Sequence, residues 1–181
     1  MNKLTEKQFD SIIDRFTSKT IYPKASLMHP AKSEHYTVAS NAHTILFLSN
    51  QLVGDSINPE RFLTAEQGKQ LLTLESRFID NYKQSSNNLA LDEELIESII
   101  SSLKQHKKEL KTHKQAYTYI SYDKSVNGLS FSTYALSNNS AEYKKQSLFR
   151  PASVSDDIND FSILINANYL IDALETQLIT D

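Results

Sequence analysis

Residues 92–136 have the sequence DEELIESIISSLKQHKKELKTHKQAYTYISYDKSVNGLSFSTYAL, which predicts one long helix followed by two strands. Asp92 is a suitable N-cap, and acidic residues follow it where the helix dipole favours negative charge. Apolar residues recur at helical spacing and form one stripe for burial: Leu95, Ile96, Ile99, Ile100, Leu103 and Leu110. Beyond the helix, residues 116–122 and 129–136 predict a hairpin, with a turn at residues 123–128.

Upstream, the chain begins with the same kind of unit. Thr5 and Gln8 have the spacing of a capping box, and a helix with one apolar face should follow. Residues 24–28, 36–40 and 43–48 predict short strands, joined by turns at residues 30–33 and 40–42.

Downstream of these strands, residues 51–63 predict a loop. Thr64 and Gln67 form a second capping box, which opens another helix, and the polar run at residues 83–88 predicts a linker. Residues 138–160 are expected to form a long loop with at most a short strand near Leu148. A strand at 161–165 and a helix at about 168–178 close the chain. These elements predict an α+β fold of repeated helix-plus-hairpin units with an additional helix. We expect a single domain over 1–181, with a helical insertion at about 60–88.

Composition excludes several classes of function. The 181 residues include no cysteine, so disulfides, Fe–S clusters and thiolate zinc sites are excluded. Three scattered glycines do not form a phosphate-binding loop. The net charge is −3, no apolar run approaches the roughly 20 residues of a membrane span, and residues 1–7 do not resemble a signal peptide. We therefore expect a cytoplasmic protein with no membrane partner.

Catalytic and metal-binding motifs are not evident in the sequence. The five histidines include no pair at the i, i+4 spacing of a helical metal site, so we expect polar surface histidines, no metal and no cofactor. No Gly-x-Ser-x-Gly elbow occurs, and the chain is not expected to be an enzyme. A Ser–His–Asp arrangement depends on spatial proximity, which sequence spacing does not test.

The most distinctive charged feature is a lysine cluster near the end of the long helix. Its members are Lys104, Lys107, Lys108, Lys111 and Lys114. Two interpretations stay open: the lysines complement the negative end of the helix dipole, or they form a row that contacts phosphates without reading bases. The predicted hairpin also carries five aromatic residues: Tyr117, Tyr119, Tyr122, Phe131 and Tyr134. They could pack across the strands or stack on single-stranded bases, and packing is favoured.

Two segments resemble the DNA sliding-clamp superfamily of the bacterial β-clamp type. Residues 36–46, YTVASNAHTIL, resemble the strand–turn–strand of that family, with Ala39, His43 and Leu46 in matching places. Residues 161–174, FSILINANYLIDAL, resemble its strand-into-helix segment. The resemblance covers about 25 residues and implies repeated βαβββ units whose basic helices face DNA phosphates. It departs from the family at residues 40–42, which replace an Asp-Gly turn, and at Thr44, which replaces a basic residue.

The resemblance and the lysine cluster together suggest a function. The first hypothesis is a non-enzymatic, clamp-like accessory protein of DNA metabolism, which contacts DNA phosphates non-specifically or binds a DNA-processing enzyme such as a polymerase or nuclease. The alternative is a protein-interaction module, encoded by a phage or mobile element, that inhibits a host protein. Homo-oligomerisation is open under both hypotheses.

Overall fold

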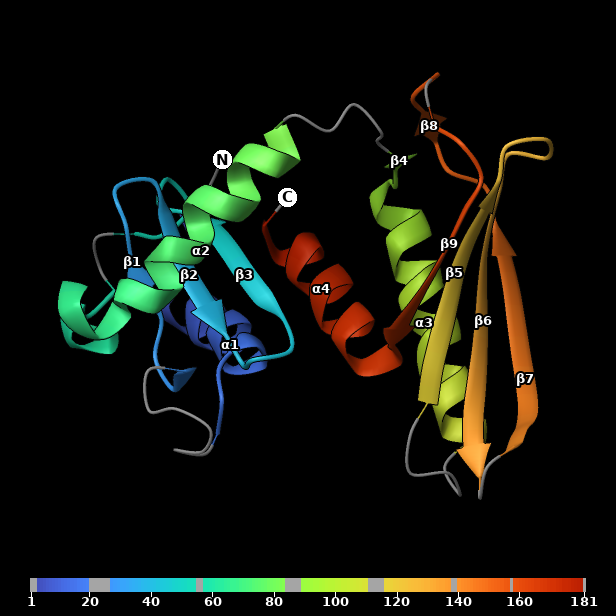
Figure 1. The fold of residues 1–181 in the computed structure, drawn as a ribbon, viewed down its shortest axis with the longest axis horizontal. Coiled ribbons are helices and arrows are strands. Elements are labelled where there is room, and N and C mark those ends of the chain that lie inside the picture. Colours follow the sequence, from blue (N-terminus) through green and yellow to red (C-terminus); the bar gives the residue numbers. More distant parts are fainter. Residues whose placement is uncertain are drawn as a thin grey trace. The chain divides into compact units, whose positions relative to one another are not determined.

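A computed structural model describes residues 3–19, 27–54, 57–83, 89–110, 116–137, 140–156 and 158–180 (Figure 1). The chain divides into two compact units. Unit 1 comprises Met1–Gln84 with Ile179–Asp181, and unit 2 comprises Ser85–Leu178. The boundary therefore falls in the polar run at residues 83–88 that the sequence marks as a linker. This division does not test whether both units form one domain, so the single domain over 1–181 stays a prediction.

Unit 1 is built on a three-stranded antiparallel sheet with a helix on each face. The strands are β1 (Ala31–Lys32), β2 (Tyr36–Ser40) and β3 (Ile45–Ser49), in the order β1-β2-β3. Ala39 and Leu48 pack in the cluster that includes α1 (Glu6–Phe16), whereas Val38 packs in the cluster that includes α2 (Ala65–Lys83). Neighbouring residues of a strand point to opposite faces, so β2 is buried on both sides.

The capping boxes predicted from the sequence are present in unit 1. Thr5 accepts a hydrogen bond from the Gln8 amide, and the Gln8 side chain accepts one from the Thr5 amide. Thr64 and Gln67 make the same reciprocal pair at the start of α2. The helix predicted near residues 60–88 thus packs on the sheet of unit 1 through Leu71, which is buried.

Other predictions for unit 1 were wrong in detail. The turn at residues 30–33 contains β1, a strand of two residues that is held by pairing with Thr37 and Val38 rather than by its own pattern. Leu27 and Met28 are not in a strand, and residues 24–26 lie outside the described part of the chain. The strand predicted at residues 43–48 begins at Ile45, and a 3₁₀ turn, η2 (Pro59–Arg61), interrupts the predicted loop.

The turn between β2 and β3 places Ala42 in the left-handed region, with φ at 73°. Asn41 stabilises this turn, because its side-chain oxygen accepts hydrogen bonds from the amides of His43 and Thr44. The left-handed conformation costs a residue with a Cβ atom about 1–2 kcal/mol, a cost that glycine avoids. The turn therefore keeps a conformation suited to glycine although alanine stands there.

We expect Ala42→Gly to stabilise unit 1 by about 1 kcal/mol, since it removes this strain. Urea unfolding followed by circular dichroism measures the change. Ala173→Gly is the matched control, because Ala173 is exposed within a helix, and there the same substitution should destabilise by about 0.5–1 kcal/mol. Equal losses at both positions would show that the turn is not strained.

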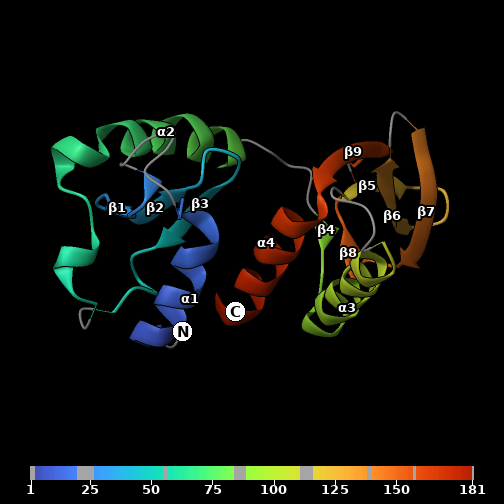
Figure 2. The ribbon, with the colours of Figure 1, turned by 90° about the horizontal axis from the view of Figure 1, so that it is seen from below.

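Unit 2 has a four-stranded antiparallel sheet in the order β7-β6-β5-β9. Its strands are β5 (Ala116–Asp123), β6 (Gly128–Ser137), β7 (Ser140–Phe149) and β9 (Phe161–Asn166). A second, two-stranded sheet joins β4 (Leu89–Ala90) and β8 (Ser153–Val154). Helix α3 (Glu93–Glu109) lies along one face of the larger sheet, and α4 (Ala167–Thr180) follows β9 (Figure 2).

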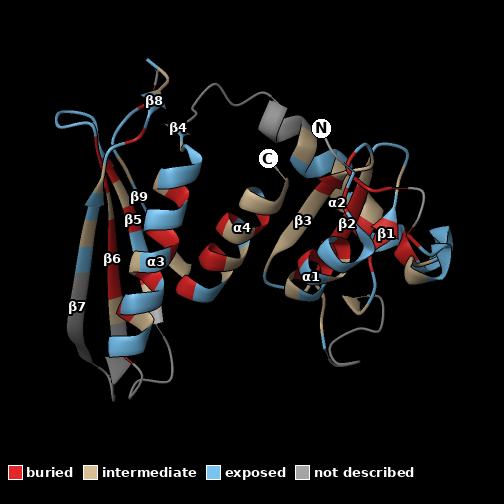
Figure 3. Ribbon diagram, turned by 180° about the vertical axis from the view of Figure 1, so that it is seen from behind, coloured by how far each residue is buried: buried red, intermediate tan, exposed pale blue. Residues whose placement is uncertain are grey.

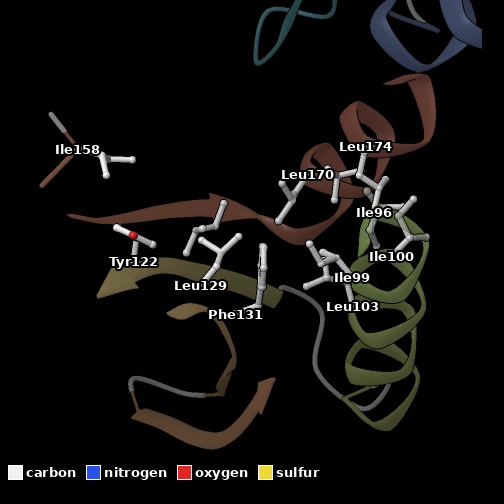
Figure 4. Packing of buried hydrophobic residues seen from close by; sticks show 12 residues of the cluster. Ile96, Ile99, Ile100, Leu103, Tyr122, Leu129, Phe131, Ile158, Leu170 and Leu174 are labelled. Carbon is white, nitrogen blue, oxygen red and sulfur yellow. The ribbon is translucent and has the colours of Figure 1, made fainter. Parts of the chain in front are cut away.

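The core of unit 2 lies between the sheet and its helices (Figure 4). Asp92 caps α3 by accepting a hydrogen bond from the Leu95 amide, as the sequence predicts. The apolar stripe of α3 is buried while its other side is exposed (Figure 3). The stripe packs with sheet residues such as Phe131 and with Leu170 and Leu174 of α4. Apolar burial thus joins α3, the sheet and α4 into one core.

The β5–β6 hairpin forms at the predicted positions. Asp123 accepts hydrogen bonds from the hydroxyl and the amide of Ser125, and these bonds lower the pKa of the Asp123 carboxyl. Asn127 adopts a φ of 46° in the same turn and accepts a hydrogen bond from the Tyr122 hydroxyl. The turn is therefore held by side chains as well as by strand pairing.

The prediction of a long loop at residues 138–160 was wrong, because most of this segment forms β7 and β8. β7 is an edge strand that pairs with β6 from Ser140 to Phe149, with an irregularity between Ala135 and Leu136. Its backbone pairing with β6, rather than an alternation of apolar residues, sets the strand. The α+β class is confirmed, and the order strand, helix, three strands occurs in unit 2 as β4, α3, β5, β6 and β7.

Candidate functional site

Three lysines of the cluster, Lys104, Lys107 and Lys108, lie on the last two turns of α3, next to α4 of the same unit. Lys104 is exposed and forms a salt bridge with Glu175, with 2.5 Å between Nζ and Oε1. Lys107 is half-buried and donates a hydrogen bond to the side chain of Asn168. Lys108 is exposed, and no ion pair or hydrogen bond joins it to another described residue. Lys111 and Lys114 lie outside the described residues.

These contacts divide the described lysines by their availability. Lys104 and Lys107 link α3 to α4, so part of their charge is already offset within unit 2. An exposed ion pair contributes only about 0–1 kcal/mol of stability, so its main effect here is on the local field. The basic residues also lie where cations complement the helix dipole. Lys108 is the described lysine best placed to contact an external anion.

His106 is buried, which contradicts the interpretation of the histidines as surface residues. Only 6% of His106 is exposed, and its imidazole lies between α3 and the sheet. Its position follows from the sequence: His106 comes three residues after Leu103 and four before Leu110, on the buried stripe. This helical spacing is the sequence signal from which the burial of His106 could have been predicted. His29, His35 and His43 are exposed, as predicted, and His113 lies outside the described residues.

Hydroxyl groups surround the His106 imidazole. Nδ1 is 3.1 Å from the Thr133 hydroxyl, which is 3.0 Å from the hydroxyl of Thr118. Nε2 is 3.1 Å from the Ser147 hydroxyl and 3.4 Å from that of Ser102, and the two serine hydroxyls contact each other. The imidazole therefore has a hydroxyl partner on each nitrogen, and this satisfies a buried polar group.

An open cavity of about 580 Å³ lies beside the two serines, between α3 and the edge strand β7. It is lined by Glu97, Ser98, Ser101, Ser102, Gln105, Ser147, Leu148 and Phe149. Glu97 is the charged residue of this lining, and the other polar groups are hydroxyls and one amide. Within the described ranges, no three His, Asp or Glu side chains come together as a metal site requires. No described helix is both long and apolar enough to cross a membrane.

The hairpin aromatics mostly pack, as the sequence analysis favours. Tyr122 and Phe131 are buried in the core of unit 2. Tyr119 and Tyr134 meet edge to face with their ring centroids 5.4 Å apart. On the face of the sheet opposite α3, Tyr119 pairs in register with Leu164, and Leu148 lies on the same face. Leu148 and Leu164 are 65% and 53% exposed, so this face offers apolar surface to a partner.

A likeness of fold connects this chain with a solved structure. It is similar to the crystal structure of the beta subunit from DNA polymerase of Streptococcus pyogenes, with a TM-score of 0.50 and 13% sequence identity. The match covers 96% of this chain and 55% of that chain, so this chain spans about half the length of the protein it matches. No protein-family model matches the chain, and no curated protein matches its sequence. The predicted resemblance to the sliding-clamp fold is thus confirmed as a partial likeness of fold.

Proposed function

We propose that this chain is a non-enzymatic, clamp-like accessory protein of DNA metabolism. The observation that carries the proposal is the likeness of fold to the beta subunit from a DNA polymerase. The basic end of α3 would contact DNA phosphates without reading bases, or the chain would bind a DNA-processing enzyme such as a polymerase or nuclease. Homo-oligomerisation and a cytoplasmic location belong to the same proposal.

Lys108 is central to the phosphate contact. Lys108 is exposed, and the buried apolar stripe of α3 holds the helix that carries it in place. Lys111 and Lys114 follow along the chain and would extend the basic row. Lys104 and Lys107 would contribute less, since Glu175 and Asn168 already hold them.

We expect the triple substitution Lys108→Glu, Lys111→Glu and Lys114→Glu to weaken binding to duplex DNA steeply. Each phosphate contact adds about 0.9 to the slope of log affinity against log salt, because binding releases condensed counterions. The magnitude of that slope should therefore be smaller by about two to three in the variant. Fluorescence anisotropy with a labelled duplex, measured from low to physiological salt, gives both quantities.

Two control variants distinguish a contribution of this site to DNA binding from a general effect of the net charge. Lys104→Gln removes a lysine that Glu175 already pairs with, so the DNA affinity should change less than with Lys108→Gln. Lys69→Glu changes an exposed lysine on α2 and should alter the salt slope little. A flat salt response of the unmodified protein, or equal losses for Lys69→Glu and Lys108→Glu, would remove the phosphate contact from the proposal.

A second candidate function rests on the exposed apolar face of the unit 2 sheet. Exposed leucines on an open sheet are suited to contact a protein partner. The chain would then be an interaction module, encoded by a phage or mobile element, that inhibits a host protein. A partner retained from nuclease-treated lysate by the unmodified chain, and lost with Leu148→Glu and Leu164→Glu, would favour this function over DNA contact.

A further inference from the structure

We propose that Ser147 is a nucleophilic hydroxyl that His106 activates, and that it accepts an acyl group from activated esters at the cavity between α3 and β7. This reactivity goes beyond the proposed accessory function and depends on different residues. The diagnostic arrangement of such a site is a nucleophile within hydrogen-bond reach of a base, with a third group that orients the base. Ser147, His106 and Thr133 have that arrangement.

Thr133 allows the tautomer that this chemistry needs. A neutral imidazole carries one proton, so one nitrogen donates and the other accepts. When Nδ1–H donates to the Thr133 oxygen, the Thr133 hydroxyl can donate onward to Thr118. Nε2 is then the acceptor and faces the Ser147 hydroxyl at 3.1 Å. Thr133 is a positioning residue in this scheme, comparable in role to the carboxylate of a catalytic triad.

Burial and exposure are divided between base and nucleophile as a reactive site requires. His106 is 6% exposed, so bulk water does not compete for its nitrogens. Ser147 and Ser102 are half-buried and line the cavity. Ser102 contacts the Ser147 oxygen and can donate to it, which leaves the Ser147 proton directed at Nε2. Glu97 at the cavity disfavours anionic donors, so neutral or cationic acyl esters are the expected class.

The reaction conserves atoms and electrons without a further reagent. The Ser147 oxygen attacks the ester carbonyl carbon, and its proton moves to His106 Nε2. The bond between the carbonyl carbon and the leaving oxygen breaks, and the leaving group departs as an alcohol or phenol after it takes that proton. The products are an acyl ester of Ser147 and a neutral imidazole.

The test uses p-nitrophenyl acetate with the full chain. Nitrophenol release gives the rate, and peptide mass spectrometry after an acid quench locates the acetyl group. We expect acetylation at Ser147, with loss of the fast release in Ser147→Ala. His106→Gln should slow the release by about 100-fold or more, which is the usual contribution of a general base. Circular dichroism and thermal unfolding verify that each variant is folded.

The chain contains its own control pair. Ser121 and Ser162 have hydroxyls 2.9 Å apart in the same unit, on the sheet face opposite α3, and His106 lies on the other face. Thr133→Val keeps the side-chain shape but removes the hydroxyl, whereas Thr133→Ser retains it. Slow release in the valine variant and fast release in the serine variant would assign the orienting role to Thr133. Acetylation of Ser121 or Ser162 at the rate of Ser147, or acetylation absent from Ser147, would overturn the proposal.

Discussion

Replacing Phe9 with alanine should lower the free energy of unfolding of unit 1 by about 3–5 kcal/mol. Phe9 is fully buried on the inner face of α1, and its ring centroid lies 5.7 Å from that of Phe62. It packs in one cluster with Ile12 and Leu48, so its side chain joins α1 to the sheet. Truncation removes the buried ring and leaves a cavity that a close-packed core fills only in part.

Phe78→Ala is the matched control for this prediction, because Phe78 is 50% exposed on α2. The same change there should cost less than about 1 kcal/mol. Urea unfolding measures the loss, and native-state hydrogen exchange assigns it to each unit. If residues 1–181 fold as one domain, amides of β5 and β6 lose protection together with those of β2. Similar losses from Phe9→Ala and Phe78→Ala would mean that α1 does not anchor the core of unit 1.

The helices could be predicted because their signals are local. Thr5, Thr64 and Asp92 each cap a helix through bonds to a residue three positions along the chain. Apolar spacing then identified the buried face of α1 and of α3. Strand pairing is not local, and the sequence located it only where alternation was strong, as in β5 and β6. β1 and β7 depend on a partner strand, so their own residues did not reveal them.

The candidate site was predictable only along α3 itself. The sequence placed Lys104, Lys107 and Lys108 at the end of that helix, and they lie there. It could not show that Lys107 meets Asn168, which is 61 residues further along. The pairing of Lys104 with Glu175 depends on the same α3–α4 packing. Long-range contacts of this kind are set by how the core packs, which the charge pattern does not encode.

The site around His106 was missed for a related reason. Its five participants come from α3, β5, β6 and β7, and one of these strands was predicted as a loop. A hydroxyl from β7 can reach the imidazole only because β7 pairs with β6 in a register that sets Ser147 opposite Phe131. Since Phe131 faces the core, Ser147 points to the same side of the sheet. Register, rather than sequence spacing, thus assembles the site.

Leu103→Ala should lower the free energy of unfolding of unit 2 by about 2–5 kcal/mol, the second large effect that the structure predicts. Leu103 is fully buried in the core formed by α3, the sheet and α4 (Figure 4). Leu148→Ala is the control, because Leu148 is 65% exposed and should lose less than about 1 kcal/mol. Chemical unfolding followed by circular dichroism compares the two variants.

The same substitution tests what holds α3 on the sheet. Leu103 precedes His106 by less than one turn, so both side chains face the sheet from the same stripe. A hydrogen bond contributes about 0.5–1.5 kcal/mol net, whereas burial of a leucine contributes about 1.5–3 kcal/mol. Apolar contact should therefore dominate, and Leu103→Ala should cost more than Thr133→Val, which removes only a hydroxyl from the network. The reverse order would mean that the hydroxyl network around His106, rather than the apolar stripe, anchors the helix that carries both the lysines and the serine cavity.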